Sequence, residues 1–97
     1  MSLNSKATRY LRGLAHHLKP VVQIGNNGPS AEVIHATREA LEHHELIKCK
    51  VDGDRDNVRE AADSLVTGTH AALVQIIGKT VVLYKARKED PDITLPK

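Results

Sequence analysis

A predicted strand, a turn and the start of a helix follow one another in the stretch Val21-Val22-Gln23-Ile24-Gly25-Asn26-Asn27-Gly28-Pro29-Ser30. It starts as a short apolar strand, turns at a loop bounded by two glycines, and ends at a serine suited to the N-cap of a helix. A helix N-terminus behind a loop of small residues offers unpaired N–H groups and a positive dipole end, which favour phosphate. The pattern also suits a plain strand-to-helix connection, because G-x-x-G is short and common.

A helix is predicted before this strand, from residue 5 to about residue 17. Its apolar residues recur every three or four positions and make one stripe: Ala7, Tyr10, Leu11, Leu14, Ala15 and Leu18. A second, basic stripe runs beside it: Arg9, Arg12, His16 and Lys19. No acidic residue is interleaved with these cations to form i,i+4 pairs. The basic stripe is therefore either a solvated face or a surface for an anionic partner.

A second helix and a second strand follow the glycine loop. The helix is expected from the Ser30 cap to about His43, and the strand covers Leu46–Val51. Alternation along the strand puts Lys48 and Lys50 on one face and apolar residues on the other. One face of this strand is thus polar, so the strand is half exposed or near a sheet edge.

A third helix is predicted after a polar turn. Asp54 or Asp56 can cap its start, and Gly68 is placed to end it in the left-handed conformation. Its core face repeats at helical spacing: Val58, Ala61, Ala62, Leu65 and Val66.

Two apolar strands, residues 72–77 and 81–85, close the pattern around a Gly78-Lys79 hairpin turn. The helix-connected strands favour parallel pairing, whereas the hairpin adds an antiparallel pair. The prediction is a single α/β domain of order α-β-α-β-α-β-β with a mixed four-stranded sheet. Its expected limits are residues 1–86, with residues 87–97 as a C-terminal tail.

Composition narrows the function classes. The formal charge is +2, and the cations gather near the two ends of the chain. Only Tyr10 and Tyr84 are aromatic, which argues against a platform that stacks bases. Any nucleic-acid binding is therefore expected to depend on charge, backbone and shape.

Catalysis and metal binding are not expected. The adjacent histidine pairs point about 100° apart on a helix, and no compact ligand set is present. Asp52, Asp54 and Asp56 resemble the start of a calcium loop, but the sixth position is Asn57 instead of glycine. The lone Cys49 lies on the apolar face of its strand, which predicts an inert core thiol in a reducing, cytoplasmic setting.

No stretch is long and apolar enough to suggest a membrane span or a signal peptide. The expected protein therefore has no membrane partner, no cofactor and no metal, and its oligomeric state stays open.

Several segments together resemble the stand-alone CRM-domain proteins of the bacterial YhbY type. The matching segments are Leu11-Arg12-Gly13-Leu14-Ala15-His16, Leu18-Lys19-Pro20-Val21-Val22-Gln23-Ile24-Gly25, Gly28, Ala40-Leu41-Glu42-His43-His44-Glu45-Leu46-Ile47-Lys48 and Gln75-Ile76-Ile77-Gly78-Lys79-Thr80-Val81-Val82-Leu83-Tyr84. They occur in order, without large gaps, over almost the whole domain.

This resemblance implies an RNA-binding domain similar in fold to the C-terminal domain of translation initiation factor three. It also implies a G-x-x-G loop like that of KH domains and association with precursors of the large ribosomal subunit. Gly25 and Gly28 correspond to the loop glycines, with Asn26 and Asn27 between them. Family members often carry a lysine in this loop, whereas here the loop has no cation. The loop is therefore expected to act through its backbone amides and shape.

The resulting hypothesis is a non-catalytic RNA-binding protein that acts in large-subunit assembly, with ribosomal RNA or precursor particles as partner. The residues expected to contact RNA are Arg9, Arg12, His16, Lys19, Gly25, Asn26, Asn27 and Gly28. Phosphate contacts of this kind position a nucleic acid without reading its sequence. The alternative is a protein-interaction module whose basic helix docks on an acidic ribosomal or other protein.

Overall fold

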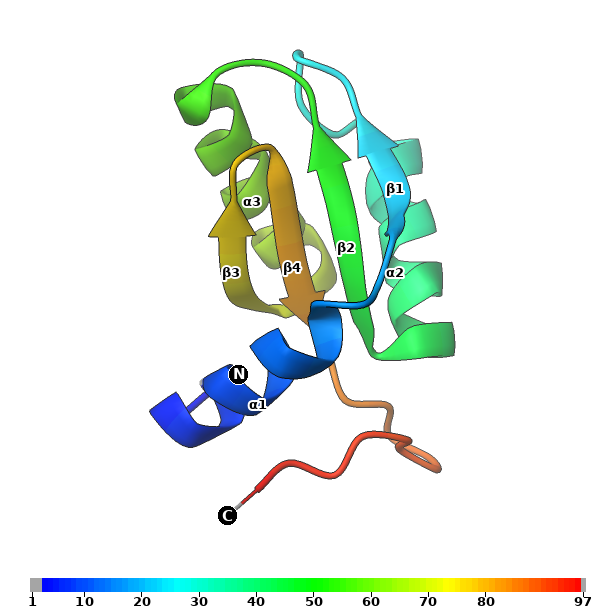
Figure 1. The fold of residues 1–97 in the computed structure, drawn as a ribbon. Helices are drawn as coiled ribbons and strands as arrows, with labels where there is room; N and C mark the ends of the chain where they lie inside the picture. Colours follow the sequence, from blue (N-terminus) through cyan, green and yellow to red (C-terminus); the bar gives the residue numbers. More distant parts are fainter. Residues whose placement is uncertain (1–2, 97) are drawn as a thin grey trace.

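A computed structural model describes residues 3–96 and contains the predicted elements in the predicted order (Figure 1). They are α1 (Ser5–Ala15), β1 (Pro20–Ile24), α2 (Ala31–His44), β2 (Leu46–Val51), α3 (Arg55–Thr69), β3 (Ala72–Ile77) and β4 (Thr80–Tyr84). The α-β-α-β-α-β-β order is thus confirmed. In this part of the chain, no helix combines the length and apolar content needed to cross a membrane.

The four strands form one mixed sheet in the order β1-β2-β4-β3. The pair β1 and β2 is parallel, while β2 with β4 and β3 with β4 are antiparallel. β2 is therefore a central strand. Of the two explanations for Lys48 and Lys50, the edge position is wrong and partial exposure is right, because Lys48 is half-buried and Lys50 exposed.

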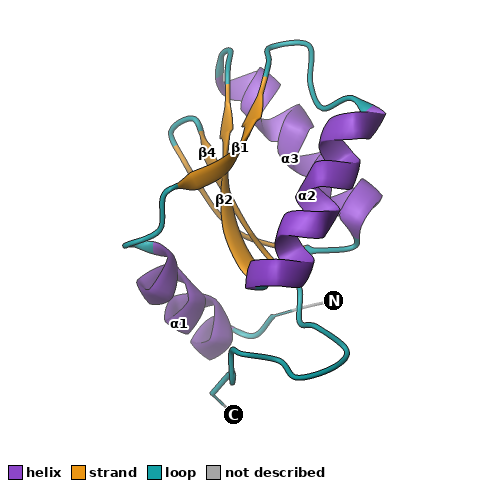
Figure 2. Cartoon of the chain, turned by 90° about the vertical axis from the view of Figure 1, so that its right-hand side faces the viewer, coloured by secondary structure: helices purple, strands orange, loops and turns teal. Residues whose placement is uncertain are grey.

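The sheet separates two apolar clusters. Helices α2 and α3 cover one face, while α1 lies against one end of the other face (Figure 2). The larger cluster, under α2 and α3, includes Ile24, Leu41, Ile47, Cys49, Val51, Leu65, Val81 and Leu83. The smaller cluster, under α1, consists of Leu11, Ala15, Leu46, Val74, Val82 and Tyr84. The rest of the second face carries Lys48, Lys50 and Gln75 as well as the exposed Ile77, and the surface described below lies there.

All three helices begin at side-chain caps, which fix where the loops end. The side chain of Asn4 accepts a hydrogen bond from the Ala7 N–H at 2.7 Å. Ser30 Oγ accepts from the Val33 N–H at 3.2 Å, as predicted. Asp54 caps α3 in a reciprocal capping box with Asn57. Each cap satisfies a helix N–H that has no partner within the helix.

The predicted end of α3 at Gly68 is wrong. The helix continues to Thr69, and His70 takes the left-handed conformation with φ 62°. Gly68 serves packing instead, since a Cβ built at this position would lie 2.8 Å from Cγ2 of Ile34 on α2. The glycine allows α2 and α3 to approach closely, and the chain turns at the next available position.

Gly68→Ala is therefore expected to destabilise the protein by about 1–3 kcal/mol, as overpacking does. Gly13→Ala is the matched control, because it also lies in a helix and nothing is within 4 Å of its built Cβ. That change is expected to stabilise the protein by up to about 1 kcal/mol. Urea unfolding of both variants measures whether each change raises or lowers the free energy of unfolding. Equal changes in the two variants would contradict the proposed contact between position 68 and Ile34.

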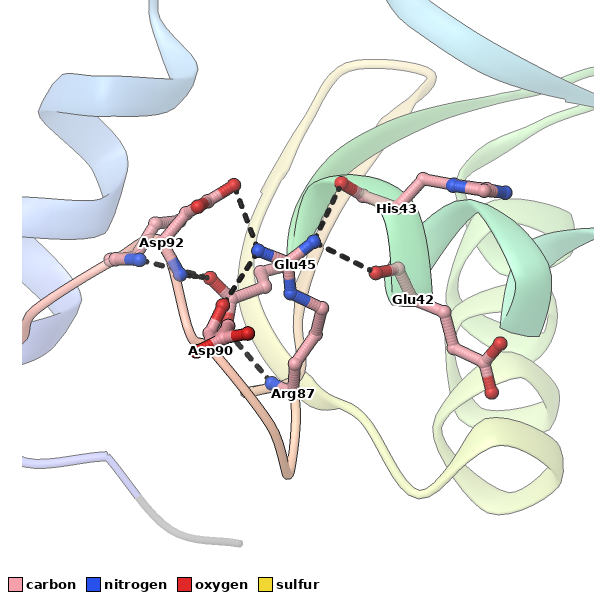
Figure 3. Close-up of polar contacts among 7 residues, drawn as sticks. Glu42, His43, Glu45, Arg87, Asp90 and Asp92 are labelled. Atoms are coloured by element: carbon pink, nitrogen blue, oxygen red, sulfur yellow. Dashed lines mark hydrogen bonds and ion pairs between the residues drawn. The ribbon is translucent and has the colours of Figure 1, made fainter.

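The segment after β4 has no regular structure, yet it is fixed to the domain by the buried carboxylate of Glu45 (Figure 3). This carboxylate accepts three backbone N–H groups, from Arg87 at 2.8 Å, Asp92 at 2.6 Å and Ile93 at 2.9 Å. Ile93 and Leu95 then pack against the cluster under α1. The tail thus adds apolar cover to that cluster.

Arg87 completes the junction between the tail and α2. Its guanidinium donates to the last carbonyls of α2, those of Glu42 and His43, and pairs with the Asp92 carboxylate at 3.0 Å (Figure 3). Cations at a helix C-terminus are favourable because the dipole is negative there. The division into residues 1–86 and 87–97 stays a prediction, and residues 1, 2 and 97 lie outside the described chain.

Candidate nucleic-acid interface

A basic surface forms where α1 meets the open part of the sheet. Lys48 and Lys50 alternate along β2 with residues of the larger core. Their side chains therefore point away from α2 and α3, on the opposite face of the sheet. Arg12 of α1 and His16, the residue that caps the end of α1, line the same hollow as Lys48, which has a volume of about 340 Å³. The structure thus brings two predicted RNA-binding residues beside a lysine distant in sequence.

The electrostatic character of this surface is positive. Among the described residues that line the hollow, none is acidic; the remaining ones are Gly13, Ala15, Gln75 and Ile77. Arg12 and His16 are exposed. Exposed cations without a facing carboxylate keep their donors available to an anion such as phosphate. This surface, called the basic face below, comprises Arg9, Arg12, His16, Lys48 and Lys50.

The predicted basic stripe of α1 does not stay together along its whole length. Arg9 shares a shallow hollow with Arg12, at the N-terminal side of α1. Lys19 follows the end of the helix and borders a different groove, beside Leu18, Val21 and His44. Arg9, Arg12 and His16 therefore belong to one surface, whereas Lys19 lies at the boundary of another.

The Gly25–Gly28 loop is an exposed turn at the far end of β1 from α1 (Figure 1). The Gly28 N–H donates to the Gly25 carbonyl at 3.1 Å, and Gly28 has φ 87°, which favours glycine. The Asn57 side chain donates to the Asn26 carbonyl at 3.2 Å and ties the loop to the start of α3. The side chains of Asn26 and Asn27 are exposed beside the N-terminus of α2.

The helix α1 and the Gly25–Gly28 loop are not adjacent. The two therefore do not form one site for a single phosphate. The five residues of β1 separate them, which at strand rise is roughly 16 Å. An RNA backbone reaching both must cross the sheet in an extended form. Lys50 lies on this route, because it pairs with Gln23 of β1 and Thr80 of β4.

The loop end of the sheet carries one more cation. The Lys79 carbonyl accepts from the Val51 N–H at 2.8 Å, so the β3–β4 turn lies against the end of β2. The side chain of Lys79 is exposed. Lys48, Lys50 and Lys79 are not among the residues that the sequence predicts to bind RNA. Strand alternation groups the first two, but no sequence signal places them beside α1 or the loop.

The buried reactive groups have structural roles. Cys49 is fully buried, as predicted, and burial raises the pKa of its thiol to about 12. The pKa of Tyr84 is also raised, first by burial and then by the charge of Glu45. Between residues 3 and 96, no three His, Cys, Asp or Glu side chains gather in a way that would hold a metal ion. The basic face is thus the surface with the clearest chemistry.

Comparison with known sequences matches residues 3–85 to the CRS1/YhbY (CRM) domain. An "RNA-binding protein" of Haemophilus influenzae is 45% identical over 97 residues, covering 99% of this chain and 97% of the relative. The "Probable RNA-binding protein YqeI" of Bacillus subtilis is 44% identical over 95 residues, covering 97% and 99%. These relatives are small proteins that align with this chain from end to end.

A solved structure has the same fold. The solution structure of SAV1595 from Staphylococcus aureus, a hypothetical protein thought to bind RNA, superposes with a TM-score of 0.85 at 41% sequence identity. The match covers 98% of this chain and 100% of the other. Family model, relatives and fold agree, and this chain belongs to the CRS1/YhbY (CRM) domain family.

Proposed function

We propose that this protein binds RNA, with the basic face as the main contact surface. The observation that carries the proposal is the meeting of Arg12 and His16 with Lys48 in a hollow whose described lining has no acidic residue. The relatives of Haemophilus and Bacillus are named for RNA binding, which supports RNA as the anionic partner. Binding through phosphate positions the RNA without selecting its sequence.

The proposed path of the RNA runs from α1 across β2 to the Gly25–Gly28 loop. Arg9, Arg12 and His16 hold one end and Lys48 and Lys50 the middle. At the loop, Gly25, Asn26 and Asn27 contribute backbone and amide donors, while Gly28, whose own N–H is bonded to the Gly25 carbonyl, holds the turn in shape. The N-terminal dipole of α2 favours phosphate there. Lys19 borders a different groove from the one that Arg12 and Lys48 line, so its removal is expected to weaken RNA binding least of the proposed contacts.

A charge placed in the loop tests this path. Gly25→Asp is expected to weaken binding of a fluorescein-labelled single-stranded RNA roughly fivefold to tenfold, since a carboxylate there repels phosphate. The fold should tolerate the change, because nothing lies within 4 Å of the built Cβ. Gly25→Asn is the matched control of nearly equal size. If both variants bind as the unmodified protein does, the loop does not contact the RNA.

The proposed role is non-catalytic. Cys49 is an unsuitable nucleophile, because it is buried and its thiol pKa is raised to about 12. Binding by charge and shape also requires no cofactor.

The proposed setting is cytoplasmic assembly of the large ribosomal subunit, with ribosomal RNA or precursor particles as partner. We expect the protein to sediment with precursors of the large subunit in a sucrose gradient of cell extract. Sedimentation only at the top of the gradient, also at low salt, would contradict this setting while leaving RNA binding untouched.

A further inference from the structure

The apolar stripe predicted for the first helix is divided in two by the fold. Ala7, Leu11 and Ala15 are buried against the sheet. Tyr10 and Leu14 are 42% and 38% exposed, and Leu18, just past the helix, is 39% exposed. Tyr10 and Leu14 are four positions apart and therefore lie on one flank of α1, and Leu18 lines the same groove as Leu14. This flank is not used by the core of the domain.

The exposed flank continues into a groove of about 450 Å³ that is mostly apolar. Leu14 and Leu18 form one side, Val21 of β1 lies beside them, and Ile93 of the tail borders the groove. Val21 is 54% exposed. Apolar patches that stay open on a small protein often mark binding sites for other proteins. We call this surface the apolar groove.

The formal charge in the lining of the apolar groove is positive. Lys19 supplies it, and within residues 3–96 the lining contains no carboxylate. The carboxylate next to Ile93, that of Asp92, is paired with Arg87 at 3.0 Å. A partner that combines apolar side chains with acidic ones complements such a groove. A second copy of this chain would bring the Lys19 side chains near one another, which opposes self-association.

We propose that the apolar groove binds an acidic amphipathic helix of a partner protein, with leucine-type side chains toward Leu14, Leu18 and Val21. The groove and the basic face lie on different flanks of α1, since Arg12 and Leu14 are two positions apart, or about 200° around the helix. The α1 helix thereby presents one flank to RNA and the other to protein. This inference holds whether or not the basic face binds RNA.

A synthetic peptide tests the groove directly. The probe is a fluorescein-labelled helix of about four turns with leucines at i, i+3, i+4 and i+7 and glutamates on its other face. We expect saturable binding in fluorescence anisotropy, with a dissociation constant below about 1 mM. Leu14→Gln with Leu18→Gln should weaken binding roughly tenfold. The matched control is Ile77→Gln on the opposite edge strand, β3, which removes a side chain that is 52% exposed and does not line the apolar groove, so peptide binding should not change.

A charge reversal at Lys19 is the second test of the apolar groove. Lys19→Glu is expected to weaken the glutamate peptide and to strengthen an otherwise identical lysine peptide. Absence of saturable binding, equal binding of both peptides to the unmodified protein, or equal loss in Ile77→Gln would each overturn the proposal. A concentration-dependent dimer in sedimentation velocity, abolished by Leu14→Gln, would also overturn it, because a second copy would then occupy the groove.

Discussion

Replacing Arg12 and Lys48 together by glutamine is expected to weaken binding to single-stranded RNA roughly tenfold to a hundredfold at low salt. These two side chains line one hollow from different elements, so an RNA backbone on the basic face contacts both. When the protein neutralises fewer phosphates, fewer counterions leave the RNA on binding. The slope of log K against log salt is therefore expected to fall in magnitude by about 0.7 for each phosphate that is no longer neutralised.

The control removes the same charge elsewhere. Arg59→Gln with Lys88→Gln lowers the net charge equally, and both residues are exposed and outside the basic face. This control is expected to change affinity less than threefold or so, because distant exposed charges are screened. Equal weakening by the two double variants would mean that RNA responds to net charge alone, and the basic face would lose its role.

Glu45→Ala is expected to cause a large loss of stability, about 3–5 kcal/mol, because three backbone N–H groups lose a buried acceptor. The carboxylate is fully buried and accepts the N–H groups of Arg87, Asp92 and Ile93, which the change leaves without their partner. Glu45 also has φ 60°, which alanine does not relieve. A domain of this size has a total stability of about 5–15 kcal/mol, so the variant approaches the threshold of folding.

Glu45→Gln separates charge from shape. Glutamine keeps the size and one acceptor oxygen, so a smaller loss of about 1–2 kcal/mol is expected. Urea unfolding at neutral pH measures both variants. If Glu45→Ala unfolds at the same urea concentration as the unmodified protein, the tail is not held by this carboxylate.

The same group predicts a dependence of stability on pH. Burial acts to raise the pKa of Glu45, but the three backbone N–H groups and the charge of Arg87 lower it below the ordinary 4.5. A carboxyl group whose pKa is lowered by folding contributes stability above its unfolded pKa. That stability is lost as the pH falls below 4.5 through the folded pKa. Glu45→Gln should flatten this part of the curve.

The order of elements is predictable because periodicity and turn residues are local signals. The strand before Gly25, the Ser30 cap and the hairpin at Gly78 all depend on residues close in sequence. The prediction for Gly68 is wrong for the opposite reason. Its role is a contact with Ile34 on another helix, and no local pattern distinguishes a packing glycine from a terminating one.

The candidate site is predictable only in part. The basic spacing of α1 is visible in the sequence, but the position of Lys48 beside Arg12 results from how α1 packs on the sheet. The same packing separates Lys19 from Arg12 and leaves Leu14 exposed. Helical spacing shows that a face is apolar or basic. It does not show which part of that face the rest of the fold will cover.

The buried role of Glu45 is also invisible in the sequence. A glutamate at the end of a helix is ordinary, and its partners lie more than forty residues away in the tail. A segment rich in charge and proline, without a periodic pattern, predicts no fixed position on the domain. Tertiary hydrogen bonds to a single carboxylate, and packing of Ile93, hold it in place instead.

Photocrosslinking identifies directly which surface of the protein contacts RNA. A single-stranded RNA containing 4-thiouridine is irradiated with the protein, and the modified peptides are identified by mass spectrometry. We predict adducts in α1 between residues 9 and 16, in β2 near Lys48 and Lys50, and in the Gly25–Gly28 loop. Adducts confined to the outer surfaces of α2 and α3, or none at an RNA concentration that saturates binding, would contradict RNA binding through the basic face and the loop.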